Sequence, residues 1–473
     1  MPAVLRQAVF EPRTTLTSGL ALLGAAAVGV LAAATSPLLI AAALAAAAVL
    51  GVVWWRPWTG VFLFVAVIAV LPFGVIPVPI GGAQLTMVDA VLIATYSAVL
   101  GRVAFGGWKL PLGVTGAALV AFVLVIGISF VGGSASSAPP PELIRRVAKL
   151  VASLLFFIVA GALLTRGNRV PELLRWLMLA GAIQGTIGTL LMLLPPITQL
   201  NLLSSLRVIG YPLTDVLRYV PGPNNTYTDQ LRAIGTSVDP NVLGGTLMLA
   251  LALIVVQWAT PKPLFRRSLL VVLAVPTSIG ILLSLSRASW VGLSVGLLLV
   301  GTLRYRRILI LFVIAGLALL ATPAGQDVVE RFVSGFSTAD RATAFRVGEY
   351  ANAVTLIQRY PLLGIGFGLS PDIDVTAGVS SVYLLVAEQT GLIGLGIYLI
   401  ALGSAWLIGL RALQRLHEPR AQGIEAGCFA ALSGALVTGL LDHYFANQAF
   451  PHAVALFWLY AAALVQAARP SAD

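Results

Sequence analysis

The chain has 473 residues, of which 59% are hydrophobic and only 10% are charged. Soluble chains carry about a quarter charged residues, so this composition excludes an ordinary soluble domain. The net charge is +11, and the single cysteine, Cys428, excludes an intrachain disulfide and a metal site built from several thiolates.

Long apolar runs recur along the whole sequence, and they are long enough to cross a bilayer core of about 30 Å. The runs lie at about residues 15–34, 37–55, 57–75, 86–101, 112–131, 148–165, 172–194, 241–259, 267–285, 288–303, 308–322, 381–408, 425–441 and 450–467. They predict an all-α polytopic membrane protein with about 14 transmembrane helices (12–14), forming one integral membrane domain over 1–473. The first run resembles a signal peptide, but a second run begins directly after it, so we expect a retained helix.

The charged residues predict how these helices are oriented. With the N-terminus in the cytoplasm, the inner loops hold 18 of the 29 basic residues but only five of the 18 acidic ones. This asymmetry satisfies the positive-inside rule and predicts that both the N and C termini are cytoplasmic. The basic character is therefore a signal of topology, and we expect no nucleic-acid partner.

Two outer segments are too long to be simple turns, an outer loop at 195–240 and a large outer loop at 323–380. Long loops in a compact protein are usually functional. Ten of the 11 basic residues on the outer side or in the membrane are arginine, whose planar guanidinium matches phosphate oxygens. The pattern indicates an anionic, lipid-linked ligand. Lipid headgroups, or pairing with the 13 remaining acidic residues, would explain the same arginines.

The first outer loop ends at a predicted helix start. Asp239 occupies the position of an N-cap, and Pro240 follows at the first helical position. Arg232 precedes them, and Gly244 and Gly245 permit a close approach of backbones.

A tight turn at residues 284–290 carries Arg287 between two apolar runs. An arginine there either extends toward the membrane surface or binds a ligand. The serines on both sides of Arg287 favour a polar pocket.

The second outer loop is predicted to contain an amphipathic helix that begins near Arg341. Arg346, Glu349 and Tyr350 are spaced to share one face of this helix, which ends before Pro361. Alternating glycines at 364, 366 and 368 then permit a turn pressed against a neighbouring element.

Three more polar features follow. Asp372 and Asp374 resemble the acidic pair of metal-dependent glycosyltransferases, although such a pair is common by chance. Ser381 and Glu388 lie on one face of the next helix, and a carboxylate about two turns into a span is functional or paired with an arginine. Asp442 and His443 occupy the last outer turn, where a histidine beside a carboxylate is a candidate general base, or simply part of a polar interfacial turn.

Together these pieces resemble the O-antigen ligase and O-antigen polymerase superfamily, whose members are GT-C-type membrane glycosyltransferases acting on glycans linked to undecaprenyl diphosphate. The matching residues are Gly235-Thr236, Asp239-Pro240-Asn241, residues 286–290, Arg346 before Pro361, residues 361–368, and Tyr383-Leu384 followed by Glu388 and residues 391–394. The resemblance covers about 230–400. It implies a GT-C-like fold in which Arg287 and Arg346 hold the donor diphosphate.

In one respect the chain departs from the ligases, which carry a His-Asn pair just before the Tyr-Leu. This chain has Ser380 and Ser381 there, so Glu349, Asp442 or His443 would have to act as the base, or the protein belongs to the polymerase branch. The residues expected in catalysis are Arg287, Arg346, Glu349, His443 and Asp442. Those expected to bind substrate are Arg232, Arg341, Tyr350, Asp239, Asn241, Ser381, Tyr383 and Glu388.

The resemblance implies a metal-independent, inverting glycosyltransferase of the bacterial inner membrane with its active face toward the periplasm. We expect no metal and no cofactor, because the polyprenyl diphosphate is a substrate carrier. The expected partners are the undecaprenyl-diphosphate-linked donor, a glycan, lipid or protein acceptor, membrane lipids, and possible neighbours such as a polysaccharide flippase and a chain-length regulator. The polymerase is our first interpretation and the ligase the second. A flippase is disfavoured because polar residues gather at one surface rather than at the midplane.

Overall fold

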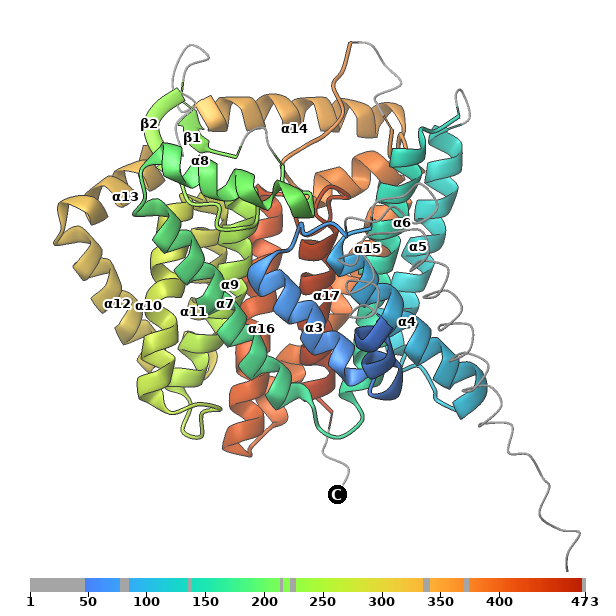
Figure 1. Cartoon of the computed structure of the whole chain (residues 1–473), viewed down its shortest axis with the longest axis horizontal. Coiled ribbons are helices and arrows are strands. Elements are labelled where there is room, and N and C mark those ends of the chain that lie inside the picture. Colours follow the sequence, from blue (N-terminus) through green and yellow to red (C-terminus); the bar gives the residue numbers. More distant parts are fainter. Residues whose placement is uncertain are drawn as a thin grey trace, which may run out of the picture.

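The computed structural model describes residues 47–76, 85–134, 138–212, 216–221, 227–334, 341–368 and 374–469. The predicted span 15–34 and most of the span 37–55 lie outside these residues. The described part is a bundle of helices, most of which run in a similar direction, while α14 lies across one end (Figure 1).

Helices account for the predicted apolar runs that the structure describes. They are α3 (Trp58–Val70), α4 (Met87–Gly106), α5 (Gly113–Gly133), α6 (Pro141–Leu164), α7 (Val170–Met192), α9 (Pro240–Ala259), α10 (Arg267–Ser284), α11 (Arg287–Leu303), α12 (Arg307–Leu320), α15 (Val382–Arg415), α16 (Pro419–Leu441) and α17 (Pro451–Ala467). Within the described residues, eight helices are long and apolar enough to cross a membrane. The chain is therefore an all-α polytopic membrane protein.

The two long segments between spans hold the remaining elements. Residues 195–240 contain α8 (Pro196–Ser205), a short 3-10 helix (Leu206–Ile209) and two antiparallel strands, β1 (Arg218–Pro221) and β2 (Tyr227–Arg232). Residues 323–380 contain α13 (Pro323–Ser334) and the predicted amphipathic helix α14 (Arg341–Arg359). The strand pair was not predicted from the sequence.

The centre of the bundle is built from α9, α11, α16 and α17, and small residues let these helices approach closely. A Cβ added at Gly292 of α11 would lie 2.5 Å from the carbonyl oxygen of Gly434, and one at Gly296 would lie 2.3 Å from that of Ala430, both on α16. Helices in membranes gain little from the hydrophobic effect, so this backbone proximity is a principal source of packing energy.

One end of the bundle gathers the basic loops. The guanidinium of Arg166 lies over the ring of Trp108 at 3.9 Å, and that of Arg169 lies over Trp58 at 4.4 Å. Lys262 Nζ lies 3.8 Å from Glu418 Oε1. These contacts pair the loop after α4 with that after α6, and the loop after α9 with that after α15. All four loops lie at the same end of the bundle (Figure 1), as expected if the basic loops share one side of the membrane.

The opposite end, here called the α14 end, carries α14, the two strands and the glycine turn. The apolar face of α14 packs in two small clusters, one with Ala353, Val379 and Leu385 and one with Leu356 and Ile365. The amphipathic pattern of α14 is thus used to seat the helix on the bundle.

The glycine turn at 361–368 docks on a break in α15. Gly391 has φ 69° and ψ −175°, which interrupts the helix that the sequence predicts as continuous. The N–H groups of Ile365 and Gly366 donate to the carbonyls of Glu388 and Gln389 at 2.9 and 3.1 Å. The turn therefore supplies partners for carbonyls that the break would otherwise leave unpaired.

Substitution of Gly391 by alanine should destabilise the protein, because its backbone conformation favours glycine and the new Cβ would lie 2.2 Å from the Leu362 carbonyl oxygen. We expect a loss of roughly 2–4 kcal/mol, seen as a lower unfolding midpoint in detergent. Gly396→Ala in the same helix is the matched control, since Gly396 has no neighbouring atom within 4 Å of an added Cβ. Equal midpoints for the two variants would contradict this account.

Candidate active site

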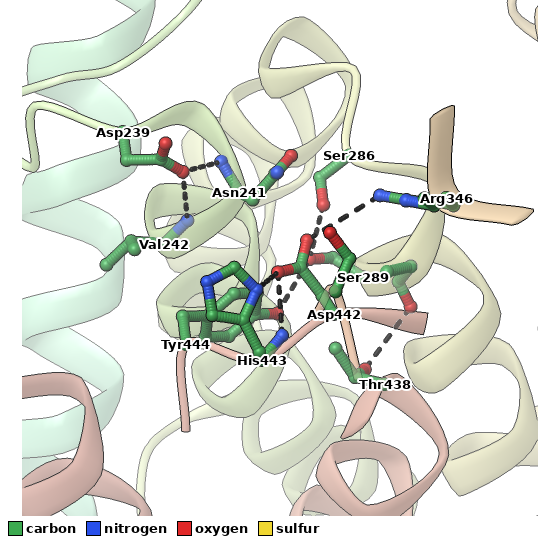
Figure 2. Close-up of polar contacts among 12 residues, drawn as sticks. Asp239, Asn241, Val242, Ser286, Ser289, Arg346, Thr438, Asp442, His443 and Tyr444 are labelled. Atoms are coloured by element: carbon green, nitrogen blue, oxygen red, sulfur yellow. Dashed lines mark hydrogen bonds and ion pairs between the residues drawn. The ribbon is translucent and has the colours of Figure 1, made fainter. Parts of the chain in front are cut away.

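Four segments meet at the α14 end of the bundle: residues 232–242, the turn at 284–290, α14, and residues 442–444 (Figure 2). They come from distant parts of the chain. The polar side chains predicted for catalysis and binding lie mainly on these segments.

Asp239 begins α9 as the sequence predicts. Its Oδ1 accepts hydrogen bonds from the backbone N–H groups of Asn241 at 2.8 Å and Val242 at 3.2 Å, and Pro240 follows at the first helical position. Burial and the nearby charge of Asp442 raise the pKa of Asp239, while its backbone hydrogen bonds and Arg232 oppose that rise. Val238 has φ 64°, a left-handed conformation that is strained for a β-branched residue.

Arg232 ties α9 to the turn that follows α10. Its Nη2 donates to Asn241 Oδ1 at 2.6 Å, and its Nε donates to the Ser284 carbonyl at 3.0 Å. The N–H of Ala233 donates to the Leu283 carbonyl at 2.9 Å. The end of β2 is therefore held against the C-terminus of α10.

The turn that carries Arg287 is fixed by hydroxyl groups. Leu285 ends α10 in the left-handed conformation, and Ser286 precedes α11, which begins at Arg287. The hydroxyls of Ser286 and Ser289 lie 3.0 Å apart. A Cβ at Gly244 of α9 would lie 2.8 Å from Ser289 Oγ, so glycine there allows α9 to approach the turn.

Asp442 is a buried carboxylate of the site, with 4% of its side chain exposed. Its Oδ2 lies 3.8 Å from Arg346 Nη2 of α14, and its Oδ1 accepts the His443 backbone N–H at 2.8 Å. His443 Nδ1 lies 3.4 Å from the same Oδ1, which is an ion-pair distance rather than a short hydrogen bond. Figure 2 shows Arg346, Asp442 and His443 side by side.

The surrounding charges make His443 more basic. Burial lowers the pKa of His443, but Asp442 raises it through contact and charge, and Glu349 and Asp239 add to that effect. The net result is a pKa above its ordinary value. An imidazole oriented by a carboxylate through Nδ1 can accept a proton at Nε2.

Two neighbouring residues of α14 hold the segment before α15. Glu349 Oε2 accepts the Ser380 N–H at 3.1 Å, and the Tyr350 hydroxyl lies 3.2 Å from the Ser380 carbonyl, to which it donates. The same hydroxyl is 3.0 Å from the Leu440 carbonyl of α16. Burial raises the pKa of Tyr350, with Arg346 opposing the rise. Glu349 thus also has a positioning task beside its predicted catalytic one.

Three other residues predicted to bind substrate form hydrogen bonds with backbone groups of other segments. The Ser381 hydroxyl donates to the Gly439 carbonyl at 3.3 Å, and the Tyr383 hydroxyl donates to the Leu436 carbonyl at 2.7 Å. Glu388 is buried, and its Oε1 accepts the Gly378 N–H at 2.7 Å. The side chain of Arg341 lies outside the described residues, although α14 begins there.

The acidic pair near the glycine turn is engaged with an arginine. Both carboxylate oxygens of Asp374 accept hydrogen bonds from Arg359, at 3.1 and 3.0 Å. Asp372 lies outside the described residues. No group of three or more His, Cys, Asp or Glu side chains that could hold a metal ion occurs in the part of the chain that the structure describes.

Tyr444 belongs to the site and was not predicted. It is buried, its hydroxyl lies 3.3 Å from Ser289 Oγ, and a Cβ at Gly245 would lie 2.3 Å from its ring. The hydroxyls of Tyr444, Ser289 and Ser286 thereby link the His443 segment to the Arg287 turn. The sequence offers one clue, since Tyr444 directly follows Asp442 and His443.

Residues 269–399 match the family model described as O-antigen ligase. The resemblance to O-antigen ligases is confirmed over these residues. It supports a surface-polysaccharide glycosyltransferase-like role for the chain. No curated protein matches the chain significantly.

The O-antigen ligase match covers only part of the site. Arg287, Arg346, Glu349 and the Ser380-Ser381 positions lie within 269–399, whereas Asp239 and the Asp442-His443 pair lie outside it. The structure brings both sets to the same end of the bundle. Residues beyond the matched range thus complete the polar cluster.

Asp442→Asn should lower the pKa of His443, because it removes the charge that outweighs the effect of burial. A pKa raised on folding stabilises the protein fully below about pH 6.5, and that stabilisation is lost as pH rises through the folded value. Histidine NMR titration of the purified protein would measure the shift, with His443→Gln identifying the signal. An unchanged titration in Asp442→Asn would contradict the ion-pair account.

Proposed function

We propose that the protein transfers glycan from a polyprenyl-diphosphate-linked donor to an acceptor hydroxyl at the α14 end, which faces the periplasm. The observation that supports this most directly is the contact of Arg346 with the Asp442-His443 pair beside the Arg287 turn. This arrangement places a cation and a candidate base together. Glycosyl transfer from a diphosphate can use the cation at the leaving group and the base at the acceptor hydroxyl.

In the proposed reaction the arginines act on the leaving group. The acceptor oxygen forms a bond to the anomeric carbon while the bond from that carbon to the diphosphate oxygen breaks. The bonding electron pair leaves with the diphosphate, whose growing negative charge Arg287 and Arg346 stabilise. Attack from the face opposite the leaving group inverts the configuration at the anomeric carbon.

His443 is the residue we assign as general base. Its Nδ1 faces Asp442, which leaves Nε2 to take the proton from the acceptor hydroxyl. Asp442 orients the ring and stabilises the imidazolium that forms. Because the pKa of His443 is raised, the rate of transfer should increase as pH rises through that pKa.

An apolar cavity beside this cluster suits the lipid part of such a donor. It has a volume of about 500 Å³ and lies between α9, α10, α11, α12 and α13. Its walls include Ile281, Trp290, Phe312 and Phe332. The indole N–H of Trp290 donates to the Ile281 carbonyl at 3.1 Å, so the cavity wall is continuous with the Arg287 turn. A donor could therefore place its diphosphate at the turn and part of its chain in the cavity.

A polymerase is the activity we favour, and a ligase is the alternative. The ligase histidine is replaced by Ser380 and Ser381, whose segment is held by Glu349, Tyr350 and Gly439. Neither serine is a base at neutral pH, so the site depends on a histidine from another segment. That difference from the ligases favours extension of a glycan over transfer to lipid A-core or protein.

Arg287→Ala and Arg346→Ala should each reduce glycan transfer by about 100-fold or more, because the leaving diphosphate loses a fixed positive charge. Transfer can be measured with membranes and a labelled lipid-linked donor. Arg145→Ala is the matched control, since Arg145 is a partly exposed arginine paired with Glu142 at 3.0 Å. Activity at the wild-type level in both site variants would exclude this mechanism.

A deletion strain should distinguish the two activities on a gel of surface polysaccharide. A polymerase predicts that long chains disappear while a single repeat still reaches the acceptor. A ligase predicts that lipid-linked polymer accumulates without reaching its acceptor. The first pattern is the one we expect.

Treatment with a metal chelator should leave the transfer rate unchanged, because arginines rather than a divalent cation are proposed to neutralise the diphosphate. Asp374, the described member of the acidic pair, is already bound by Arg359. The same transfer assay with and without chelator tests this. Loss of activity that added Mg²⁺ or Mn²⁺ restores would require a metal-dependent mechanism.

A further inference from the structure

Two arginines face each other across the strand pair at the α14 end. Arg218 of β1 and Arg232 of β2 are direct partners in the antiparallel register. Direct cross-strand partners project from the same face of a sheet, with Cβ atoms about 4.5–5.5 Å apart. The two arginine side chains therefore leave the strand pair on the same face.

This pairing is unfavourable without a compensating group. Like charges directly opposite each other destabilise a strand pair, and a two-stranded sheet is only marginally stable in itself. A short hairpin with this sequence needs either an anion bound between the two arginines or separate hydrogen-bond partners for each guanidinium group.

Of the two arginines, Arg232 alone has hydrogen-bond partners of this kind among the residues that the structure describes. It donates to the Ser284 carbonyl and to Asn241 Oδ1. Arg218 makes no hydrogen bond or ion pair with the described residues, and its Nε is buried without an acceptor. A guanidinium group has five donors, so Arg218 retains the capacity to bind an oxyanion.

The position of the pair indicates which molecule would supply that oxyanion. Ser284, which Arg232 contacts, lies three residues before Arg287 and ends α10. The arginine pair therefore borders the turn where the donor diphosphate is proposed to bind.

We propose that Arg218 and Arg232 together bind an oxyanion of the lipid-linked donor, either a phosphate of its diphosphate or a carboxylate of its glycan. This inference rests on the proposed function, because it assumes a donor of that class. It assigns Arg218 as a binding residue and gives the strand pair a role in holding the donor.

The test uses the purified full-length protein in detergent and two probes. One probe is a polyprenyl diphosphate without sugar, and the other is a polyprenyl diphosphate that carries a uronic-acid oligosaccharide. Arg218→Ala should weaken binding of at least one probe by about ten- to a hundred-fold, the loss expected for a charge-assisted hydrogen bond. Weakening with the sugar-free lipid identifies a phosphate as the anion, and weakening only with the second probe identifies a carboxylate.

Two measurements separate this role from a structural one. Arg207→Ala, which removes an exposed arginine from the same outer segment, should leave both affinities unchanged. Without ligand, Arg218→Ala should keep or raise the unfolding midpoint, because it relieves repulsion between the arginines. A lowered midpoint would show that Arg218 stabilises the fold and would overturn the inference.

The outcomes also separate this inference from the proposed function. A wild-type protein that binds neither probe overturns the proposed function, and the inference with it. Wild-type binding with the same affinity in Arg218→Ala overturns the inference alone.

Discussion

The buried carboxylate of Asp442 is the constraint on which the α14 end depends. Removing a carboxylate from water costs several kcal/mol unless other charges and donors compensate. Compensation comes from Arg346 of α14 and from the next residue, His443, through its imidazole and its backbone N–H. The charge therefore favours the arrangement in which α14 is seated against the 442–444 segment. The same charge interactions therefore fix both the geometry of the site and the position of α14.

The other contacts of α14 fix the position of this surface helix relative to the site. Its apolar face packs on Val379 and Leu385, while Glu349 and Tyr350 bind both backbone polar groups of Ser380. The packing sets the depth of the helix, and the hydrogen bonds set its register along the segment. Arg346 therefore reaches Asp442 from a helix that is held in place. Electrostatic stabilisation of a leaving group depends on such fixed positioning of the charged group.

Sequence reasoning recovered the features that depend on local periodicity and chemistry. The apolar helices, the Asp239 cap and the shared face of Arg346, Glu349 and Tyr350 all follow from spacing within a few residues. The break at Gly391 was not predicted, because glycine is common inside apolar helices and only the docking of Leu362 explains its conformation.

Contacts between segments that are far apart in the sequence could not be predicted from the sequence alone. The Tyr350 contact with Ser380 spans 30 residues, and the Ser289 contact with Tyr444 spans 155. The arginine pair on β1 and β2 depends on strand register, which hydrophobic patterning does not specify in a short polar hairpin. The roles assigned to the site residues stay predictions.

The location of the apolar cavity has a consequence for how a lipid substrate would travel. Its walls include α12 and α13, and α12 exposes Ile310, Val313, Ile314 and Leu317 on its surface. These side chains suit contact with acyl chains, which would place the cavity beside the hydrocarbon layer. Each methylene moved into water costs about 0.8 kcal/mol. A long-chain donor that slides sideways between these helices avoids that cost, and supply would then be set by two-dimensional diffusion within one leaflet.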